Sequence, residues 1–186
     1  MVQTPTELLA RFIVESRYSD LPDEALAYGR SSLLDASAVG IAGSASKGAK
    51  TLNSVLLPYS SAKGGQVIGT DIRLPAPFAA MANGNTIHAD DFDDTLAADP
   101  MAHGYHGSTH PTGPLLSTLL ALIDSKKTTG KDFLIAYHIG VEVMAKLNSA
   151  LGSRSFSAGF HPTALMSAFG SAASASVCSP RSRSVR

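Results

Sequence analysis

The sequence predicts a mainly helical fold, and three observations support that prediction. Apolar residues recur at helical spacing through most of the chain. Proline or a short polar residue stands ahead of several of these segments, where a helix would begin. Alanine, serine and glycine dominate the composition, which suits helices packed at short range. We therefore expect an all-α chain in which strand is nearly absent.

Four helical segments are expected in the first half of the chain. Residues 4–7, Thr-Pro-Thr-Glu, have the pattern of a capping box with proline at the first helical position. The second segment ends in small residues up to Gly43, which indicates burial against close neighbours. Residues 66–68 are the candidate for a short extended piece. The expected helices begin near residues 5, 22, 51 and 75, and the fourth continues through Phe92.

The second half combines a long loop with three helices. Residues 96–113 lack periodicity and are rich in glycine, proline and histidine, so we expect a loop, and loops of this length often carry function. Helices are expected at residues 114–123, 131–151 and 162–177. The final residues, 178–186, form a basic Ser/Arg segment of low complexity and are expected to be a disordered tail.

Composition excludes several classes of protein. Lys and Arg together number 15, as do Asp and Glu, so nothing favours a nucleic-acid partner. Cys178 is the single cysteine, which rules out an internal disulfide and a thiolate metal cluster. The N-terminus lacks the pattern of a secretory signal. The sequence contains no apolar run of about 18 residues, so we expect no membrane span. We expect a soluble, cytoplasmic protein.

Histidine and aspartate are concentrated between residues 88 and 110. On a helix, His88, Asp91 and Asp94 would lie on one face. Such a group fits a solvated helix end, a proton-transfer site of carboxylate and imidazole, or a metal site. Metal is the weaker functional interpretation, because the group matches no dedicated motif such as His-Glu-x-x-His. The residues concerned are His88, Asp90, Asp91, Asp93, Asp94, Asp99, His103, His106 and His110.

Two His-Pro-Thr sequences stand directly ahead of apolar helical segments. They place His110 and His161 at helix entrances, where backbone N–H groups favour an anion. A lone His-Pro is usually an ordinary turn, but two of them near a carboxylate-rich window suggest imidazoles that converge on an acidic substrate. His138 lies inside an expected helix and is interpreted as a hydrogen-bonded packing histidine. Neither a Gly-x-Ser-x-Gly elbow nor a glycine-rich nucleotide loop is present.

Four motifs occur in a fixed order along the chain. Residues 83–94 read Asn-Gly-x-x-x-His-x-x-Asp-Phe-Asp-Asp, and residues 109–113 read Thr-His-Pro-Thr-Gly. Residues 137–143 read Tyr-His-Ile-Gly-Val-Glu-Val, and residues 159–163 read Gly-Phe-His-Pro-Thr. Together these motifs resemble the amino-terminal part of the MmgE/PrpD family. Four ordered motifs across residues 1–177 are far more specific than any one of them.

The resemblance implies an all-helical domain joined to a smaller α+β lid domain, with the active site between them. It implies lyase activity on a small di- or tricarboxylate, of the 2-methylcitrate dehydratase or cis-aconitate decarboxylase type. It also implies no metal, no organic cofactor and a homodimer. Carried over by motif, the residues that line the active site are Asp91, His110 and His161.

The resemblance stops near residue 177, and the lid with its active-site lysines has no counterpart in this chain. We therefore expect an incomplete helical domain at residues 1–177, followed by the tail at 178–186. Apolar faces of residues 114–123 and 162–177 should then be partly bare. Two alternatives remain open: an inactive helical fragment that keeps only a dimerisation role, and an isomerase or epimerase of the same family.

Overall fold

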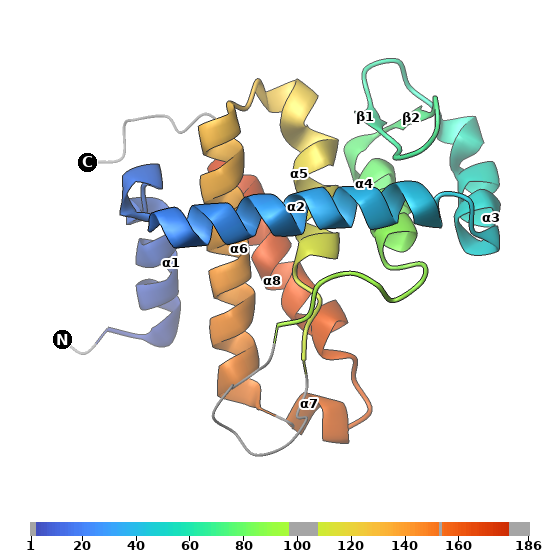
Figure 1. Ribbon diagram of the computed structural model, residues 1–186. Coiled ribbons are helices and arrows are strands. Elements are labelled where there is room, and N and C mark those ends of the chain that lie inside the picture. The colour runs from blue at the N-terminus through green and yellow to red at the C-terminus, as the bar shows by residue number, and fades with distance from the viewer. Residues whose placement is uncertain (1–2, 97–107, 153, 179–186) are drawn as a thin grey trace.

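The computed structural model describes residues 3–96, 108–152 and 154–178, and this part of the chain is helical apart from one small hairpin (Figure 1). The all-α prediction is confirmed. Short 3₁₀ turns cover Tyr18–Asp20 and Leu57–Tyr59. The helices are α1 (Pro5–Glu15), α2 (Asp23–Gly43), α3 (Lys47–Leu56), α4 (Ala76–Ile87), α5 (Thr112–Lys126), α6 (Gly130–Leu151), α7 (Arg154–Ser157) and α8 (Pro162–Cys178). None of them is long and apolar enough to cross a membrane.

Local sequence signals account for where several helices begin. The predicted capping box of α1 is present: the Glu7 amide donates to Thr4 Oγ1 at 3.3 Å, and the Thr4 amide donates to Glu7 Oε2 at 2.8 Å. Thr129 and Asp132 form the same arrangement at the start of α6. These reciprocal bonds satisfy backbone donors that have no partner within the helix, so both starts are defined locally.

Helix α5 lies at the centre of the molecule, between α4 on one side and α6 and α8 on the other (Figure 1). Helix α2 runs across this set and contacts α4, α5 and α6. Leu115 and Leu119 of α5 are fully buried in the main core, together with apolar side chains of α6 and α8. Gly140 and Gly170 let α6 and α8 approach closely, because a Cβ at either position would overlap side chains across the contact. The packed α5–α6–α8 unit is the support on which the polar residues described below are placed.

The hairpin pairs β1 (Gly65–Gln66) with β2 (Arg73–Leu74) in antiparallel register. It includes the start of the extended piece expected at residues 66–68. Asn83 of α4 holds it in place: its amide donates to the Gln66 carbonyl at 2.9 Å, and its Oδ1 accepts from the Ile68 amide at 2.8 Å. This asparagine, the first residue of the first motif, is fully buried and has a structural role.

The fourth helix differs from its prediction in a way that matters for function. Helix α4 ends at Ile87 instead of continuing through Phe92, and His88 is its C-terminal cap. Asp91 then adopts a left-handed backbone conformation, with φ at 57°. The shared helix face expected for His88, Asp91 and Asp94 is therefore wrong. Aspartates at a helix C-terminus oppose the helix dipole, whereas Asp94 reaches the N-terminus of α5, where negative charge is favoured.

Smaller differences concern other helix limits. Helix α3 begins at Lys47 instead of residue 51, because Ser46 Oγ accepts from the Ala49 amide at 3.1 Å and caps it. Helix α5 begins two residues early, at Thr112, and the short α7 was not predicted. Most of the expected loop at 96–113, with Asp99, His103 and His106, lies outside the described residues, as does the expected tail beyond Cys178.

The expectation of bare apolar faces is confirmed in part. In α5, Leu115, Leu116 and Leu119 are buried, but Leu120 and Ile123 line an apolar groove of about 470 Å³ between α2, α5 and α6. In α8, the Phe169 side chain is exposed. Helix α2, which was not expected to be bare, also exposes large apolar side chains: Tyr28, Leu34 and Ile41.

Candidate active site

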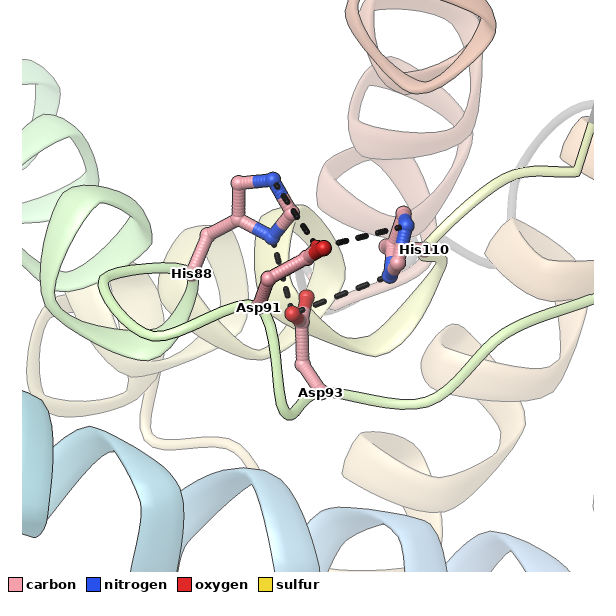
Figure 2. Close-up of side chains that lie close together, drawn as sticks. All are labelled: His88, Asp91, Asp93 and His110. Carbon is pink, nitrogen blue, oxygen red and sulfur yellow. Dashed lines mark hydrogen bonds and ion pairs between the residues drawn. The ribbon is translucent and has the colours of Figure 1, made fainter.

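Polar side chains from three separate segments meet beside the N-terminal ends of α5 and α8. His88, Asp91 and Asp93 come from the turn after α4, and His110 comes from the segment before α5 (Figure 2). His161 is the residue directly before α8, and its carbonyl accepts from the Leu165 amide at 3.3 Å. Segments far apart in the sequence thus supply one group of imidazoles and carboxylates.

Of the three residues selected from sequence, Asp91 and His161 each lie beside His110. Asp91 Oδ1 is 3.8 Å from His110 Nε2. The His110 and His161 rings are stacked, with centroids 6.4 Å apart and planes inclined by 14°. The Asp91–His110 separation is longer than a hydrogen bond, so these groups are neighbours that do not bond each other directly.

Asp93 is the buried member of the site, and sequence reasoning did not select it. Its Oδ1 is 2.8 Å from His88 Nδ1 and 3.7 Å from His110 Nδ1, so it faces both imidazoles (Figure 2). Its side chain is only 1% exposed. A buried carboxylate bonded to one ring nitrogen fixes which nitrogen carries the proton and leaves the other free for chemistry. Here the other nitrogen, His88 Nε2, is directed towards Asp91, at 3.9 Å from Oδ1.

The side chains of the site differ in their exposure to solvent. The Asp91 side chain is 76% exposed, that of His88 42% and that of His110 16%. Among the described residues, no Lys or Arg forms an ion pair with Asp91 or Asp93, and the only ion-pair partners of these carboxylates are the two imidazoles. The net charge of the site therefore depends on whether the imidazoles of His88 and His110 are protonated.

A second layer of hydrogen bonds lies beneath the site. Asp94 accepts from the Thr112 amide at 3.0 Å and from its hydroxyl at 2.6 Å, and Thr112 Oγ1 is 2.7 Å from the Tyr137 hydroxyl of α6. Burial raises the pKa of Asp94 against the lowering effect of the Thr112 hydrogen bonds, and burial also raises the pKa of Tyr137. These hydrogen bonds connect the turn after α4 to the start of α5, and so to His110 two residues before Thr112.

Thr163 links the two His-Pro-Thr motifs. Its Oγ1 accepts from the His110 backbone amide at 2.9 Å, so the threonine of the second motif holds the histidine of the first. Leu96 and Thr109 form a backbone bridge, with N–O distances of 2.7 and 2.9 Å, that brings together the two sides of the site segment. The repeated threonine was the available signal for these positioning residues, and sequence reasoning passed over it.

His138 does not belong to this group. It is half-buried on α6 against Gly29 of α2, and its Nε2 has no hydrogen-bond partner among the described residues. Burial lowers its pKa below the ordinary value of 6.5. Its packing role is as expected, whereas the expected hydrogen bond is absent at Nε2.

The described residues also contain one group with the composition of a metal site. His88, Asp91, Asp93 and His110 can each present one ligand atom, and these atoms all lie within 4.8 Å of one another. Sequence reasoning had placed metal binding behind proton transfer for this window. The arrangement itself is compatible with both uses, since imidazole nitrogens and carboxylate oxygens serve in each.

Residues 7–180 match the family model of the MmgE/PrpD N-terminal domain. The chain belongs to the MmgE/PrpD family. The four ordered motifs therefore identified the family correctly from sequence.

Two curated relatives of this MmgE/PrpD chain are named cis-aconitate decarboxylase, and a third is named as a protein like it. Cis-aconitate decarboxylase of Homo sapiens is 34% identical over 182 residues, and that of Mus musculus is 32% identical; each alignment covers 95% of this chain. The cis-aconitate decarboxylase-like protein oryM of Aspergillus oryzae is 29% identical over 94% of this chain. The chain spans 36% of the length of each of these relatives.

Proposed function

We propose that this chain supplies the proton-transfer groups of a cofactor-free lyase that acts on a small di- or tricarboxylate. The observation that carries the proposal is the convergence of Asp91, His110 and His161 from three separate segments. The family and the names of the relatives support a lyase, and decarboxylation of cis-aconitate is the reaction to test first. Dehydration of 2-methylcitrate is the second candidate.

The three imidazoles at the site, those of His88, His110 and His161, suit such a substrate because imidazole is the side chain most often used as a general acid or base. Protonated imidazoles form charge-assisted hydrogen bonds with substrate carboxylates. In decarboxylation, the electron pair of the broken carbon–carbon bond stays on the substrate carbon, carbon dioxide departs, and an imidazolium donates a proton to that carbon. In dehydration, one group removes a carbon-bound proton while another protonates the leaving hydroxyl.

Roles within the group follow from exposure and contacts. His88, whose Nδ1 is engaged by Asp93, presents Nε2 beside Asp91 and is a further candidate for the proton-transfer group. His110 is held from its backbone by Thr163, and His161 stacks on it, so both are fixed relative to the turn after α4. Fixed geometry of this kind is what lets general acids and bases act efficiently on a bound substrate.

The test begins with ligand binding to the purified chain. Titration with cis-aconitate should shift the imidazole NMR signals of His88, His110 and His161 and leave that of His138 unchanged. Carbon dioxide release should be measured in parallel, with Asp91→Asn, His110→Gln and His161→Gln each expected to reduce it by at least about 100-fold, the scale of a general acid–base contribution. Glu142→Gln, in an exposed ion pair on α6, is the matched control. Imidazole signals that ignore every carboxylate offered would contradict the proposal.

A second candidate function is that of an inactive dimerisation module. The apolar groove between α2, α5 and α6, with Leu34 strongly exposed beside it, supports this alternative. We propose a homodimer in either case, so sedimentation alone does not separate the two functions. A dimer that neither binds nor converts cis-aconitate or 2-methylcitrate would favour the inactive module. Recovery of a rearranged product without loss of water or carbon dioxide would favour an isomerase or epimerase of the family.

A further inference from the structure

We infer that Asp93 is a positioning residue that holds the imidazoles of both His88 and His110 as Nδ1–H tautomers, so that the two Nε2 atoms are the ones that exchange protons with a substrate. The inference rests on the proposed function, because it names the residue that makes two of the proposed proton-transfer groups usable. It adds a role for Asp93 at His110 and a definite protonation site on each ring.

Asp93 faces the same nitrogen of both rings. Its Oδ1 is 2.8 Å from His88 Nδ1 and 3.7 Å from His110 Nδ1 (Figure 2). The two rings meet edge to face with centroids 4.9 Å apart, so a single oxygen lies close to both Nδ1 atoms. An ionised carboxylate only accepts hydrogen bonds, so the contact with His88 requires a proton on Nδ1 of that ring.

The same carboxylate favours a proton on Nδ1 of His110. This nitrogen is buried and has no hydrogen-bond partner among the described residues, so Asp93 is the acceptor that this part of the chain offers it. In the other tautomer, the Nδ1 lone pair would face the carboxylate oxygen at 3.7 Å, and the two would repel each other. The Nδ1–H tautomer instead turns a positive hydrogen towards the carboxylate. A small rotation that brings the two atoms to about 2.9 Å completes a hydrogen bond.

The burial of Asp93 strengthens its effect on the two rings. Its side chain is only 1% exposed, so solvent screens its charge little. No described Lys or Arg forms an ion pair with it, which leaves the imidazoles as its partners. Its Oδ2 lies beside Gly113, where a Cβ would approach to 3.1 Å, at the start of α5. Negative charge is favoured at a helix N-terminus, so this place supports the ionised carboxylate.

The two Nε2 atoms share the other side of the group. Asp91 Oδ1 is 3.9 Å from Nε2 of His88 and 3.8 Å from Nε2 of His110 (Figure 2). An imidazole with a proton on Nδ1 accepts at Nε2 when it is neutral and donates from Nε2 when it is protonated. Dehydration needs a base and an acid beside one substrate, and decarboxylation needs an acid. One buried carboxylate thus prepares two such groups on the same side.

His161 provides an internal comparison. Its ring stacks on that of His110, with centroids 6.4 Å apart. Within the described chain, however, the ion pairs of Asp91 and Asp93 involve only His88 and His110. The tautomer of His161 should therefore be independent of Asp93.

The experiment is long-range proton–nitrogen NMR of the untagged, nitrogen-15-labelled 186-residue chain, which distinguishes protonated from bare ring nitrogens. At about pH 8, where ordinary imidazoles are neutral, we expect His88 and His110 to carry their proton on Nδ1. Asp93→Asn keeps the shape of the side chain and removes its charge. The Nε2–H population should then rise at both rings by at least about fivefold, because charge-assisted hydrogen bonds are roughly twice as strong as neutral ones. The signals of His161 should keep their tautomer.

The matched control is Asp90→Asn, which removes an equal charge from an exposed position in the same turn and should leave both tautomers unchanged. Far-UV circular dichroism verifies that each variant is folded, and the wild-type spectrum decides the outcome if Asp93→Asn does not fold. A proton on Nε2 of either wild-type ring, or an equal response to Asp90→Asn, would overturn the inference.

The tautomers are measured without substrate, so this inference and the proposed function can fail separately. Expected tautomers in a chain that ignores every carboxylate would count against the lyase and leave the role of Asp93 in place. In the carbon dioxide assay described above, Asp93→Asn should lower kcat by at least about 100-fold and change KM little, as expected for a group that acts through the imidazoles. An unchanged kcat would overturn the positioning role even where the tautomers are as expected.

Discussion

The α6–α8 contact and the turn after α4 are two regions built on opposite principles. Between α6 and α8 the backbones approach through Gly140 and Gly170, and Ser174 Oγ, fully buried, donates to the Ala136 carbonyl at 2.8 Å. In the turn after α4, Asp91 has a positive φ and Asp93 has an oxygen without a partner. The first region packs closely and bonds its buried hydroxyl, whereas the second contains a left-handed residue and a buried oxygen without a hydrogen bond.

The contrast shows where this chain gains stability and where it sacrifices it. Strained backbone and unsatisfied buried polar groups each destabilise a fold by about 1–3 kcal/mol, and they persist where the surroundings over-determine them. Here the packed α5–α6–α8 unit and the Asp94–Thr112–Tyr137 chain provide those surroundings. Substitutions should therefore act differently in the two regions and in the layer that joins them.

The largest effect is expected in the joining layer, at Thr112. Thr112→Val removes the hydrogen bonds that the hydroxyl makes with Asp94 and Tyr137 and keeps the backbone N–H bond to Asp94. The buried carboxylate is then less well satisfied, so the unfolding free energy should fall by about 3 kcal/mol. Urea denaturation followed by circular dichroism measures this loss. Thr112→Ser keeps the hydroxyl and should retain most of the stability. Equal losses in the two variants would mean that the hydroxyl is not what matters.

A smaller loss is expected in the packed contact. Gly140→Ala places a Cβ against Ser174 Oγ and the Leu115 side chain, both of which are buried, and should cost about 2 kcal/mol through overpacking. The same denaturation experiment applies. Gly48→Ala is the control, because a Cβ at Gly48 meets nothing within 4 Å. The stability of this variant should equal or slightly exceed that of the wild type. Comparable losses at the two glycines would contradict the close-approach argument.

The strained turn should respond in the opposite sense. Asp91→Gly and Asp91→Ala both delete the carboxylate, but only glycine adopts a φ of 57° without cost. The glycine variant should be the more stable of the two by about 1 kcal/mol. Both variants should lose carboxylate-dependent function equally. Equal stabilities would indicate that the turn relaxes to another conformation and that no strain is held there.

The smallest effect is a pH dependence that arises at His138, where α6 packs against α2. Because burial lowers the pKa of His138 below 6.5, the unfolded chain takes up this proton at a higher pH than the folded chain. His138 therefore adds no cost above about pH 6.5 and reduces stability as the pH falls below that value. His138→Gln should flatten the stability profile in this range. A profile of unchanged slope, compared with wild type from pH 7 to about pH 5 by urea denaturation, would argue against a depressed pKa.

Sequence reasoning succeeded where the signals are local. The capping box at Thr4 and Glu7, the apolar periodicity of α2, α6 and α8, and the ordered motifs each depend on residues close together in the chain. The two His-Pro-Thr sequences near the carboxylate-rich window suggested that imidazoles converge, whereas the choice of Asp91, His110 and His161 as one site came from the family resemblance.

The turn after α4 shows why the remainder could not be predicted. Hydrophobic patterning places Phe92 inside and the neighbouring aspartates in water, yet Phe92 is 76% exposed and the Asp93 side chain is 1% exposed. The left-handed conformation at Asp91 redirects the chain and inverts that pattern. Asp93 then bonds His88, and Asp94 caps a helix that begins 18 residues later. These are tertiary effects, so a reading of local periodicity extends α4 too far and misses Asp93.

The hydrogen bond between the His110 amide and Thr163 also bears on how the molecule assembles. The two residues are 53 positions apart, so the bond can form only after a long stretch of chain has closed into a loop and α8 has docked. Contacts of such sequence separation are slow to form, whereas the capped ends of α1 and α6 can form locally and early. During synthesis, a nascent chain that has not yet reached α8 holds His110 without this anchor. The imidazole group is thus a late product of folding, completed by the last helix of the described chain.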